Sequence, residues 1–361
     1  MSRSADESWT IKQLLTEVVG SGPRSAEDMS RAQAEAACHE ILADTVNPTT
    51  LGAFLLANRW KGNTPTELAG FLDTMQLESV DTITPTVDVL DCGANYDGKT
   101  NSALLGVGAG LVAAASGAPV VVHSSDRMPA SYGDTYKHVL DELDIPTEIS
   151  PETSVSMVEE VGFGFYYQPR FNPGIHGLQD RREHLGVRSF FNTIETLANP
   201  AGASTHLGSF YHLTFAKKTI ETVQESEHTE FDRVVMIQGM EGYDDIRPGN
   251  TKVAVGEDGD IQSFDINAGT FDFEFSAEDL AVSAVARESA RITKEVLEGR
   301  RQDHFADAIA LNGAIRLFAH GAVETLDDAV ERARASINEG KAAERLKALQ
   351  TFSERETDTT T

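Results

Sequence analysis

The sequence is poor in cysteine and lysine. Only two cysteines, Cys38 and Cys92, occur in 361 residues, and they lie far apart without a Cys/His spacing typical of zinc sites. The sequence therefore predicts neither a disulfide framework nor a structural zinc site. No stretch approaches the ~18 apolar residues that a membrane-spanning helix needs, and the first residues, MSRSADESW, contain no apolar signal core. We expect a cytoplasmic protein without membrane contacts.

The charge is strongly of one sign. Asp and Glu number 57 against 30 Lys and Arg, which gives a formal net charge of −27 and a pI near 4.6. Such a surface repels nucleic-acid phosphates and anionic lipids, so both are disfavoured partners. Acid-rich, lysine-poor composition is typical of proteins from a high-salt cytoplasm, where ~1 M salt screens charges within about 3 Å. Because the charge then reflects the source, nucleic acid stays open as a partner.

Hydrophobic periodicity divides the chain into a helical first part and an alternating second part. Residues 1–80 are predicted to form an N-terminal helical domain, to which later parts of the chain can add helices. Thr64-Pro65-Thr66-Glu67 has the pattern of a capping box with proline in the first turn. Residues 81–352 are predicted to form a large α/β domain, and 353–361 a flexible polar tail. The fold class is therefore α/β with a small all-helical domain.

The expected elements of the second part follow in chain order. Strands are predicted at 87–90, 119–123, 161–167 and 233–238, and shorter ones at 252–255, 262–266 and 271–275. Helices are predicted at 102–116, 135–143, 306–319, 326–339 and 342–352, with one more capped by Ser276-Ala-Glu-Asp279.

Residues 93–100, Gly-Ala-Asn-Tyr-Asp-Gly-Lys-Thr, match the phosphate-loop pattern G-x-x-x-x-G-K-[ST]. A glycine-bearing loop that leads into a helix presents free N–H groups to phosphate. The short pattern also arises by chance, and no partner strand ends in the acidic residue that nucleotide hydrolysis requires. We therefore expect phosphate contact here and do not favour an NTPase.

Four further segments, in the same order, resemble the anthranilate phosphoribosyltransferase family (glycosyltransferase family 3). LGAFLLANRWKGNTPTELAGFLDTM at 51–75 resembles its N-terminal helices, and GVRSFFNTIETLANPA at 186–201 its GVRTIFNLLGPLTNPA stretch. IQGMEGYDD at 237–245 resembles its HGxDGLDE turn, and residues 308–349 its C-terminal helices. The resemblance implies an active site in the cleft between the two domains and a homodimer. It also implies Mg²⁺-dependent transfer of phosphoribose from phosphoribosyl pyrophosphate to anthranilate or a related aromatic amine.

The family's pyrophosphate loop, GTGGDG, is altered in this chain. Gly93, Asp97 and Gly98 are kept, whereas Asn95 and Tyr96 replace the middle glycines. Small residues let a backbone approach pyrophosphate closely, so Tyr96 is the main departure. The resemblance implies substrate contacts from the kept residues, and Lys99 and Thr100 can add charge and a hydroxyl.

The remaining site residues are also implied by the resemblance, and no catalytic residue is assigned. Asp244 and Asp245 match the family's Asp-Glu pair and are the predicted ligands of Mg²⁺, which prefers oxygen. Arg182 matches the arginine that the family uses on the anthranilate carboxylate, for which a guanidinium fork is suited. The other predicted substrate contacts, near the family's His-Gly-Asn-Arg segment, are His123, Ser125 and Ser131.

Two other functions stay open. A subfamily with the same fold replaces the glycine loop with a Tyr-x-Gly-type sequence and binds nucleic acid without transferase activity, and NYDGKTN resembles that loop. Pyrimidine nucleoside phosphorylases share the architecture and a related lysine-bearing loop. The segments at 186–201 and 308–349 favour the anthranilate branch, and with it the small-molecule partners named above.

Overall fold

The computed structural model describes residues 9–94, 96–126 and 133–359, with side chains described up to residue 352. The first part of the chain is helical, as predicted, and forms four helices in its described residues. They are α1 (Ile11–Glu17), α2 (Arg31–Leu42), α3 (Pro48–Lys61) and α4 (Pro65–Glu78). The predicted capping box starts α4: the Thr64 hydroxyl accepts from Glu67 N at 3.2 Å, and Glu67 Oε2 accepts from Thr64 N at 2.8 Å.

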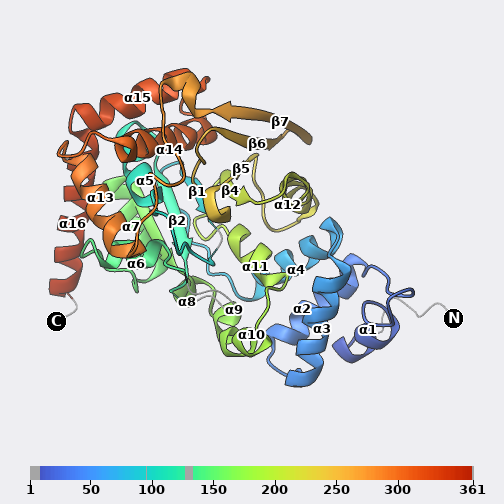
Figure 1. The fold of residues 1–361 in the computed structure, drawn as a ribbon. Coiled ribbons are helices and arrows are strands. Elements are labelled where there is room, and N and C mark those ends of the chain that lie inside the picture. The colour runs from blue at the N-terminus through green and yellow to red at the C-terminus, as the bar shows by residue number, and fades with distance from the viewer. Residues whose placement is uncertain (1–8, 95, 127–132, 360–361) are drawn as a thin grey trace.

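A seven-stranded sheet forms the centre of the larger domain, in the order β3-β2-β1-β4-β5-β6-β7 (Figure 1). The first five of these strands run parallel, and β6 and β7 are antiparallel additions at one edge. The strands are β1 (Leu90–Gly93), β2 (Val120–Ser124), β3 (Phe163–Tyr167), β4 (Thr205–Phe210), β5 (Arg233–Gln238), β6 (Asn250–Glu257) and β7 (Asp260–Asn267).

Each face of the sheet packs on its own hydrophobic core. One face is covered by α5 (Gly106–Ala115), α6 (Tyr136–Asp141), α7 (Pro151–Val161), α13 (Val285–Leu297), α14 (His304–His320), α15 (Leu326–Asn338) and α16 (Lys341–Thr359). The other face packs against α12 (Leu213–Glu225) and the helical domain (Figure 1). Side chains alternate along each strand, so neighbours in sequence point to different cores.

The helical domain also packs against the segment that follows β3. This segment contains α8 (Gln168–Phe171), α9 (Pro173–Gly177), α10 (Gln179–Leu185) and α11 (Phe191–Ile194). The rings of Phe71 on α4 and Phe190 stack with centroids 3.8 Å apart. The two domains therefore share one continuous apolar core beside the sheet, and α10 and α11 lie next to the blue helices in Figure 1.

Four local predictions were wrong. The strand predicted at 87–90 lies at Leu90–Gly93. Residues 271–275 form no strand: Phe271 ends a short 3₁₀ turn, after which the chain is irregular. Ser276 and Asp279 do exchange capping hydrogen bonds, at 2.8 and 3.2 Å, but around a turn, and the next helix begins at Val285. The helix predicted from residue 102 begins at Gly106, because residues 99–102 are held by bridges to other segments. No helix in the described part of the chain is long and apolar enough to cross a membrane.

Candidate active site

A cavity of about 340 Å³ lies where the strand ends of the larger domain face the helical domain. β1, β4 and β5 run parallel, so their carboxyl ends meet at one edge of the sheet, where α/β proteins bind ligands. Arg59 on α3 faces this edge across the cleft. The cavity is lined by Arg59, Gly93, Tyr96, Asp97, Arg188, Ser189, Asn192, Thr193, Thr196, Ser209, Phe210, Tyr211, His212, Phe215, Glu241 and Gly242.

Close backbone packing requires glycine at two positions of the loop after β1. A Cβ on Gly93 would lie 2.0 Å from Thr196 O, and Gly98 has a φ of +72° and would place a Cβ 2.3 Å from Asp134 O. Lys99 and Asp134 also exchange backbone hydrogen bonds of 2.9 Å. Because α5 begins only at Gly106, Lys99 and Thr100 do not start a helix as in an NTPase phosphate loop. The loop therefore differs in geometry from an NTPase phosphate loop.

Tyr96 turns its hydroxyl into the protein. Its Oη lies 2.5 Å from His123 Nδ1, and His123 Nε2 lies 3.3 Å from Asp91 on β1. Asp91 Oδ2 also forms a 2.7 Å hydrogen bond with His206 Nδ1 on the neighbouring strand β4. The register explains the cluster, since Asp91 pairs with His206 across the two strands. All four side chains are at most 1% exposed.

Burial and charge set the protonation of this cluster. Burial by itself raises the pKa of Asp91, but the adjacent His123 and His206 outweigh it and lower that pKa to about 2. Burial raises the pKa of Tyr96 well above its usual value, and the nearby Glu195 adds to this shift. Tyr96 is therefore a neutral phenol, and Asp91 is ionised at neutral pH.

The Glu241 carboxylate accepts hydrogen bonds from the polar groups of the loop at 100–102. Its Oε2 accepts from Thr100 N at 3.1 Å, and its Oε1 accepts from Ser102 N at 2.9 Å and from the Ser102 hydroxyl. Glu241 has a φ of +54°, in the left-handed region that non-glycine residues seldom adopt. A carboxylate of the chain thus binds Thr100, which the sequence assigns to phosphate, and Ser102, which it does not.

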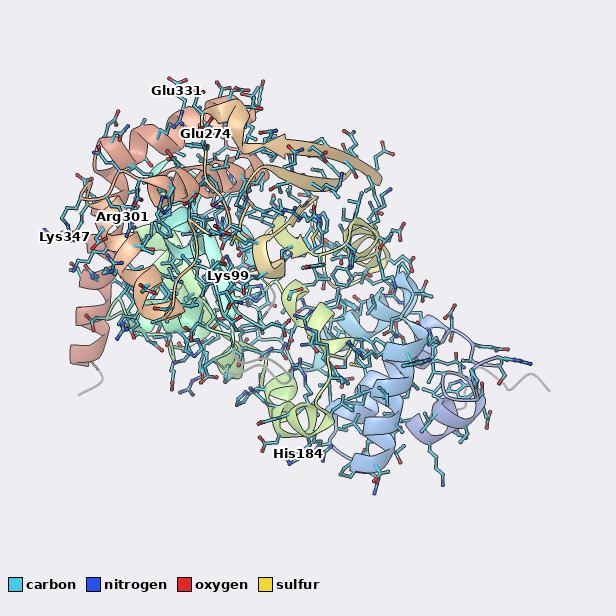
Figure 2. All side chains as sticks on the ribbon, in the orientation of Figure 1. Lys99, His184, Glu274, Arg301, Glu331 and Lys347 are labelled. Carbon is cyan, nitrogen blue, oxygen red and sulfur yellow. The ribbon has the colours of Figure 1, made fainter. Side chains whose placement is uncertain are left out.

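Lys99 points into the interior, away from the cleft. Its Nζ donates to Asp245 Oδ2 at 2.6 Å and to Ala103 O at 3.0 Å, and both charged side chains are 1% exposed. Figure 2 shows Lys99 near the centre of the molecule. The sequence placed these two residues in different roles, one on phosphate and one on Mg²⁺. The structure joins them in a buried ion pair.

The negative charge of Asp244 is likewise balanced by buried residues from other elements. Its carboxylate accepts from Arg316 Nη2 at 2.8 Å and from the Tyr136 hydroxyl, and all three side chains are fully buried. Burial raises the pKa of Asp244, with Arg316 opposing that effect. Burial also tends to lower the pKa of Arg316, but the Asp244 carboxylate outweighs it and the pKa rises.

The Asp244–Asp245 pair does not fit a resident Mg²⁺ as it stands. Such an ion requires near-octahedral oxygen ligands and keeps several waters, whereas two protein cations already neutralise these carboxylates. Of the four carboxylate oxygens, only Oδ1 of Asp245 is buried without a hydrogen-bond partner in the described structure. Among the described residues, no group of three or more His, Cys, Asp or Glu could hold a metal ion. The role of this pair as metal ligands stays a prediction.

Arg182 is also paired inside the protein. Its Nη1 and Nη2 each donate to one oxygen of Glu195 at 2.8 Å, in the bidentate geometry with which arginine binds a carboxylate. The side chains are 4% and 0% exposed. Glu195 stands where the family stretch quoted above has glycine. The arginine predicted to bind the substrate carboxylate thus binds a carboxylate of the chain.

The predicted substrate residues fall into two groups. Gly93 and Asp97 line the cavity, where Asp97 contacts Arg188. The remaining predicted residues that the structure describes do not line it: Gly98 packs on residue 134, Thr100 binds Glu241, and Lys99, His123, Ser125 and Arg182 are buried. Ser131 lies outside the described residues. The substrate roles of all these residues stay predictions.

Sequence reasoning missed the residues that partner the predicted ones. Glu195, Glu241 and Arg316 come from separate elements and carry no local motif. A signal was present for all three, because Glu195, Glu241 and Arg316 lie inside the segments 186–201, 237–245 and 308–349 that resemble the family. Arg59 and Arg188 were also missed as cleft residues, because only the fold brings α3 next to residue 188.

Two family models match the chain. The model described as the glycosyl transferase family helical bundle domain matches residues 12–77, and the a/b domain model of that family matches residues 84–343. The anthranilate phosphoribosyltransferase of Listeria welshimeri is 30% identical over 328 residues, which cover 90% of this chain and 95% of the relative. That of Methanocorpusculum labreanum is 30% identical over 329 residues, covering 90% and 94%.

Solved structures share the fold. Anthranilate phosphoribosyltransferase from Thermus thermophilus superposes with a TM-score of 0.81 at 24% identity, covering 95% of this chain and 99% of that one. The Saccharomyces cerevisiae enzyme, solved in complex with PRPP and Mg, gives 0.80 at 19% identity, covering 96% and 98%. By the family models and by its relatives, the chain belongs to the anthranilate phosphoribosyltransferase family (glycosyltransferase family 3).

Proposed function

We propose that this protein transfers the phosphoribosyl group of phosphoribosyl pyrophosphate to anthranilate or a related aromatic amine. The observation that carries the proposal is the match, at 30% identity over 90% of the chain, to enzymes named for that reaction. Separate family models for 12–77 and 84–343 support a division near residue 80, and we place the reaction in the cleft between these parts. The comparisons lend no support to the nucleic-acid-binding or phosphorylase alternatives.

In this reaction the bond between C1 and the pyrophosphate oxygen breaks, and its electron pair leaves with pyrophosphate. A bond forms between C1 and the amine nitrogen, which then loses a proton. The loop at 93–98 and the N–H and hydroxyl groups of Thr100 and Ser102 are suited to the donor's phosphates. Those groups become available when Glu241 is displaced. Asp97, at the cavity wall, can accept from the ribose hydroxyls.

Mg²⁺ enters this proposal with the donor. Bound with the donor, it would supply positive charge against the leaving pyrophosphate. Asp244 and Asp245 are already paired with Arg316 and Lys99, so we do not propose a resident protein site for the ion. The two aspartates act on the site by fixing the turn at 239–245, whose Glu241 and Gly242 line the cavity.

Assembly and location are part of the same proposal. We propose a homodimer, as the family resemblance implies, working in a high-salt cytoplasm. The net charge of −27 and the low lysine content support the salt-rich setting, because molar salt screens such repulsion. Size-exclusion chromatography with light scattering in molar KCl tests the dimer directly.

Product formation tests the proposed reaction. The protein in molar KCl is incubated with anthranilate, phosphoribosyl pyrophosphate and Mg²⁺, and loss of anthranilate fluorescence is followed while mass spectrometry identifies the adduct. We expect consumption that requires the donor and stops in excess chelator. Anthranilate loss at the rate of a protein-free control, with no adduct by mass, would contradict the proposal.

A further inference from the structure

Arg182, the arginine expected to bind the acceptor's carboxylate, is already bound by a carboxylate of the chain. Glu195 binds both terminal nitrogens of Arg182 at 2.8 Å, and neither side chain is more than 4% exposed. A substrate carboxylate would have to displace a buried carboxylate that already has ideal bidentate geometry. An acid that binds in the cleft therefore needs another cationic partner.

Two other arginines meet in the cleft, one from each domain. Arg59 of α3 donates from Nη1 to the backbone O of Arg188 at 2.8 Å, and both side chains line the cavity. Burial lowers the pKa of Arg188, and the positive charge of Arg59 lowers it further. Two arginine side chains at one cavity wall, in a protein of net charge −27, favour a bound anion beside them.

The acidic groups around this pair leave one of its charges uncompensated. Asp97 contacts Arg188, and Glu241 is engaged with Thr100 and Ser102. Within the described residues, Arg59 makes no ion pair with a carboxylate, and its one hydrogen bond to protein goes to the Arg188 carbonyl. The guanidinium of Arg59 thus has donors to offer to a ligand oxygen.

The same cavity has an aromatic wall. Tyr211 and Phe215 line it, and their side chains are 67% and 38% exposed, which is unusual for residues of this size. Exposed aromatic faces beside arginine are suited to a flat ring that carries a negative group. The cavity therefore combines a surface for an aromatic ring with cations for its carboxylate.

We propose that Arg59, with Arg188, receives the carboxylate of an aromatic amino acid acceptor in place of Arg182, while Tyr211 and Phe215 contact its ring. Glu195 then determines specificity indirectly, because it keeps Arg182 from binding a second acid. This assignment rests on the proposed transfer reaction and names the residues that choose its acceptor. The ligand of this site is an aromatic carboxylate of the size of anthranilate.

Binding measured without the donor tests the assignment separately from turnover. Anthranilate, aniline (the same ring and amine without the carboxylate) and inorganic phosphate are titrated calorimetrically into the wild type and three variants. Arg59→Met removes the charge and keeps the stem, and Arg182→Met/Glu195→Met replaces the buried pair by apolar side chains. Arg291→Met, in an exposed i,i+4 pair with Glu295, is the surface control.

We expect the wild type to bind anthranilate at least tenfold more tightly than aniline. Arg59→Met should remove this preference and leave aniline binding unchanged, whereas the double variant and Arg291→Met should keep it. A preference that survives Arg59→Met, or that disappears in the double variant, would overturn the assignment. So would binding of phosphate but not anthranilate at Arg59, which would make the pair a receptor for the donor. Intact anthranilate binding without product would instead refute the proposed reaction alone.

Discussion

Glu195 binds Arg182 through two parallel hydrogen bonds of 2.8 Å, and this pair is buried behind the cleft wall. A substrate carboxylate would make the same contacts with the same arginine. Glu195 therefore occupies, at Arg182, the position that the family pattern assigns to the acceptor's carboxylate.

Breaking this pair on one side should strongly destabilise the fold. Glu195→Gln leaves the Arg182 guanidinium buried without a counter-charge, and we expect a loss of about 3–5 kcal/mol in the free energy of unfolding. Arg182→Met/Glu195→Met should lose much less, because a buried apolar pair needs no desolvation of charge. Guanidinium chloride unfolding of the wild type, Arg182→Met, Glu195→Met and the double variant completes a double-mutant cycle and gives the coupling. Additive losses would show that the two residues do not act as a pair.

The pairing of Lys99 with Asp245 predicts how the protein responds to Mg²⁺ without donor. Lys99→Met should lower stability by about 3–5 kcal/mol, since Asp245 is left as a buried charge. Mg²⁺ should then raise the unfolding temperature of this variant, because it can take the vacated position beside Asp245. We expect no such rise for the wild type at the same KCl concentration.

Thermal unfolding with and without Mg²⁺ measures this difference. Lys252→Met is the matched control, since its exposed ion pair with Asp265 on β7 does not touch the site. A wild-type protein that Mg²⁺ stabilises as much as the variant would show that the carboxylate pair accepts the ion despite Lys99.

Much of the fold follows from the sequence because its elements carry local signals. β5 lies at residues 233–238 as predicted, where an apolar run is bounded by polar residues. β4 was missed because His206, Gly208 and Ser209 interrupt its apolar pattern. His206 is polar for a reason found only in the fold, namely its contact with Asp91 on the next strand.

The candidate site was harder to predict, since its contacts join distant residues. Lys99 and Asp245 are 146 positions apart, and nothing in either segment identifies the other as its partner. The motif at 93–100 correctly marks a tight loop at a strand end, but the partners that fill it come from other elements. Glu241 is the clearest case, because it binds the loop's donors from the turn after β5.

Glu241 should compete with phosphate for the loop at 100–102. Glu241→Ala frees the N–H groups of Thr100 and Ser102 and removes a negative charge from the cavity wall. We expect this variant to bind inorganic pyrophosphate several-fold more tightly than the wild type, as measured by calorimetry. Glu274→Ala, which changes an exposed residue that does not line the cavity, is the control. Unchanged or weaker binding would mean that Glu241 does not occupy a phosphate position.

Asp91 should make the protein sensitive to acid. Its pKa falls from 3.8 to about 2 on folding, because His123 and His206 outweigh the effect of burial. Its contribution, ~2 kcal/mol, is therefore fully present above about pH 4 and is lost as the pH falls through 2. Denaturant unfolding between pH 5 and 2 should show a shallower loss for Asp91→Asn than for the wild type. Equal slopes would contradict the role of the cluster.

Donor binding tests the central claim, that the cleft of this chain is a phosphoribosyltransferase site although its predicted residues are paired internally. Phosphoribosyl pyrophosphate is titrated calorimetrically into the protein in molar KCl with Mg²⁺. We predict saturable binding in the millimolar range or tighter, weakened further by Asp244→Ala, which removes the partner that Arg316 and Tyr136 use to fix the turn at 239–245. Absence of any binding at millimolar donor would contradict the account.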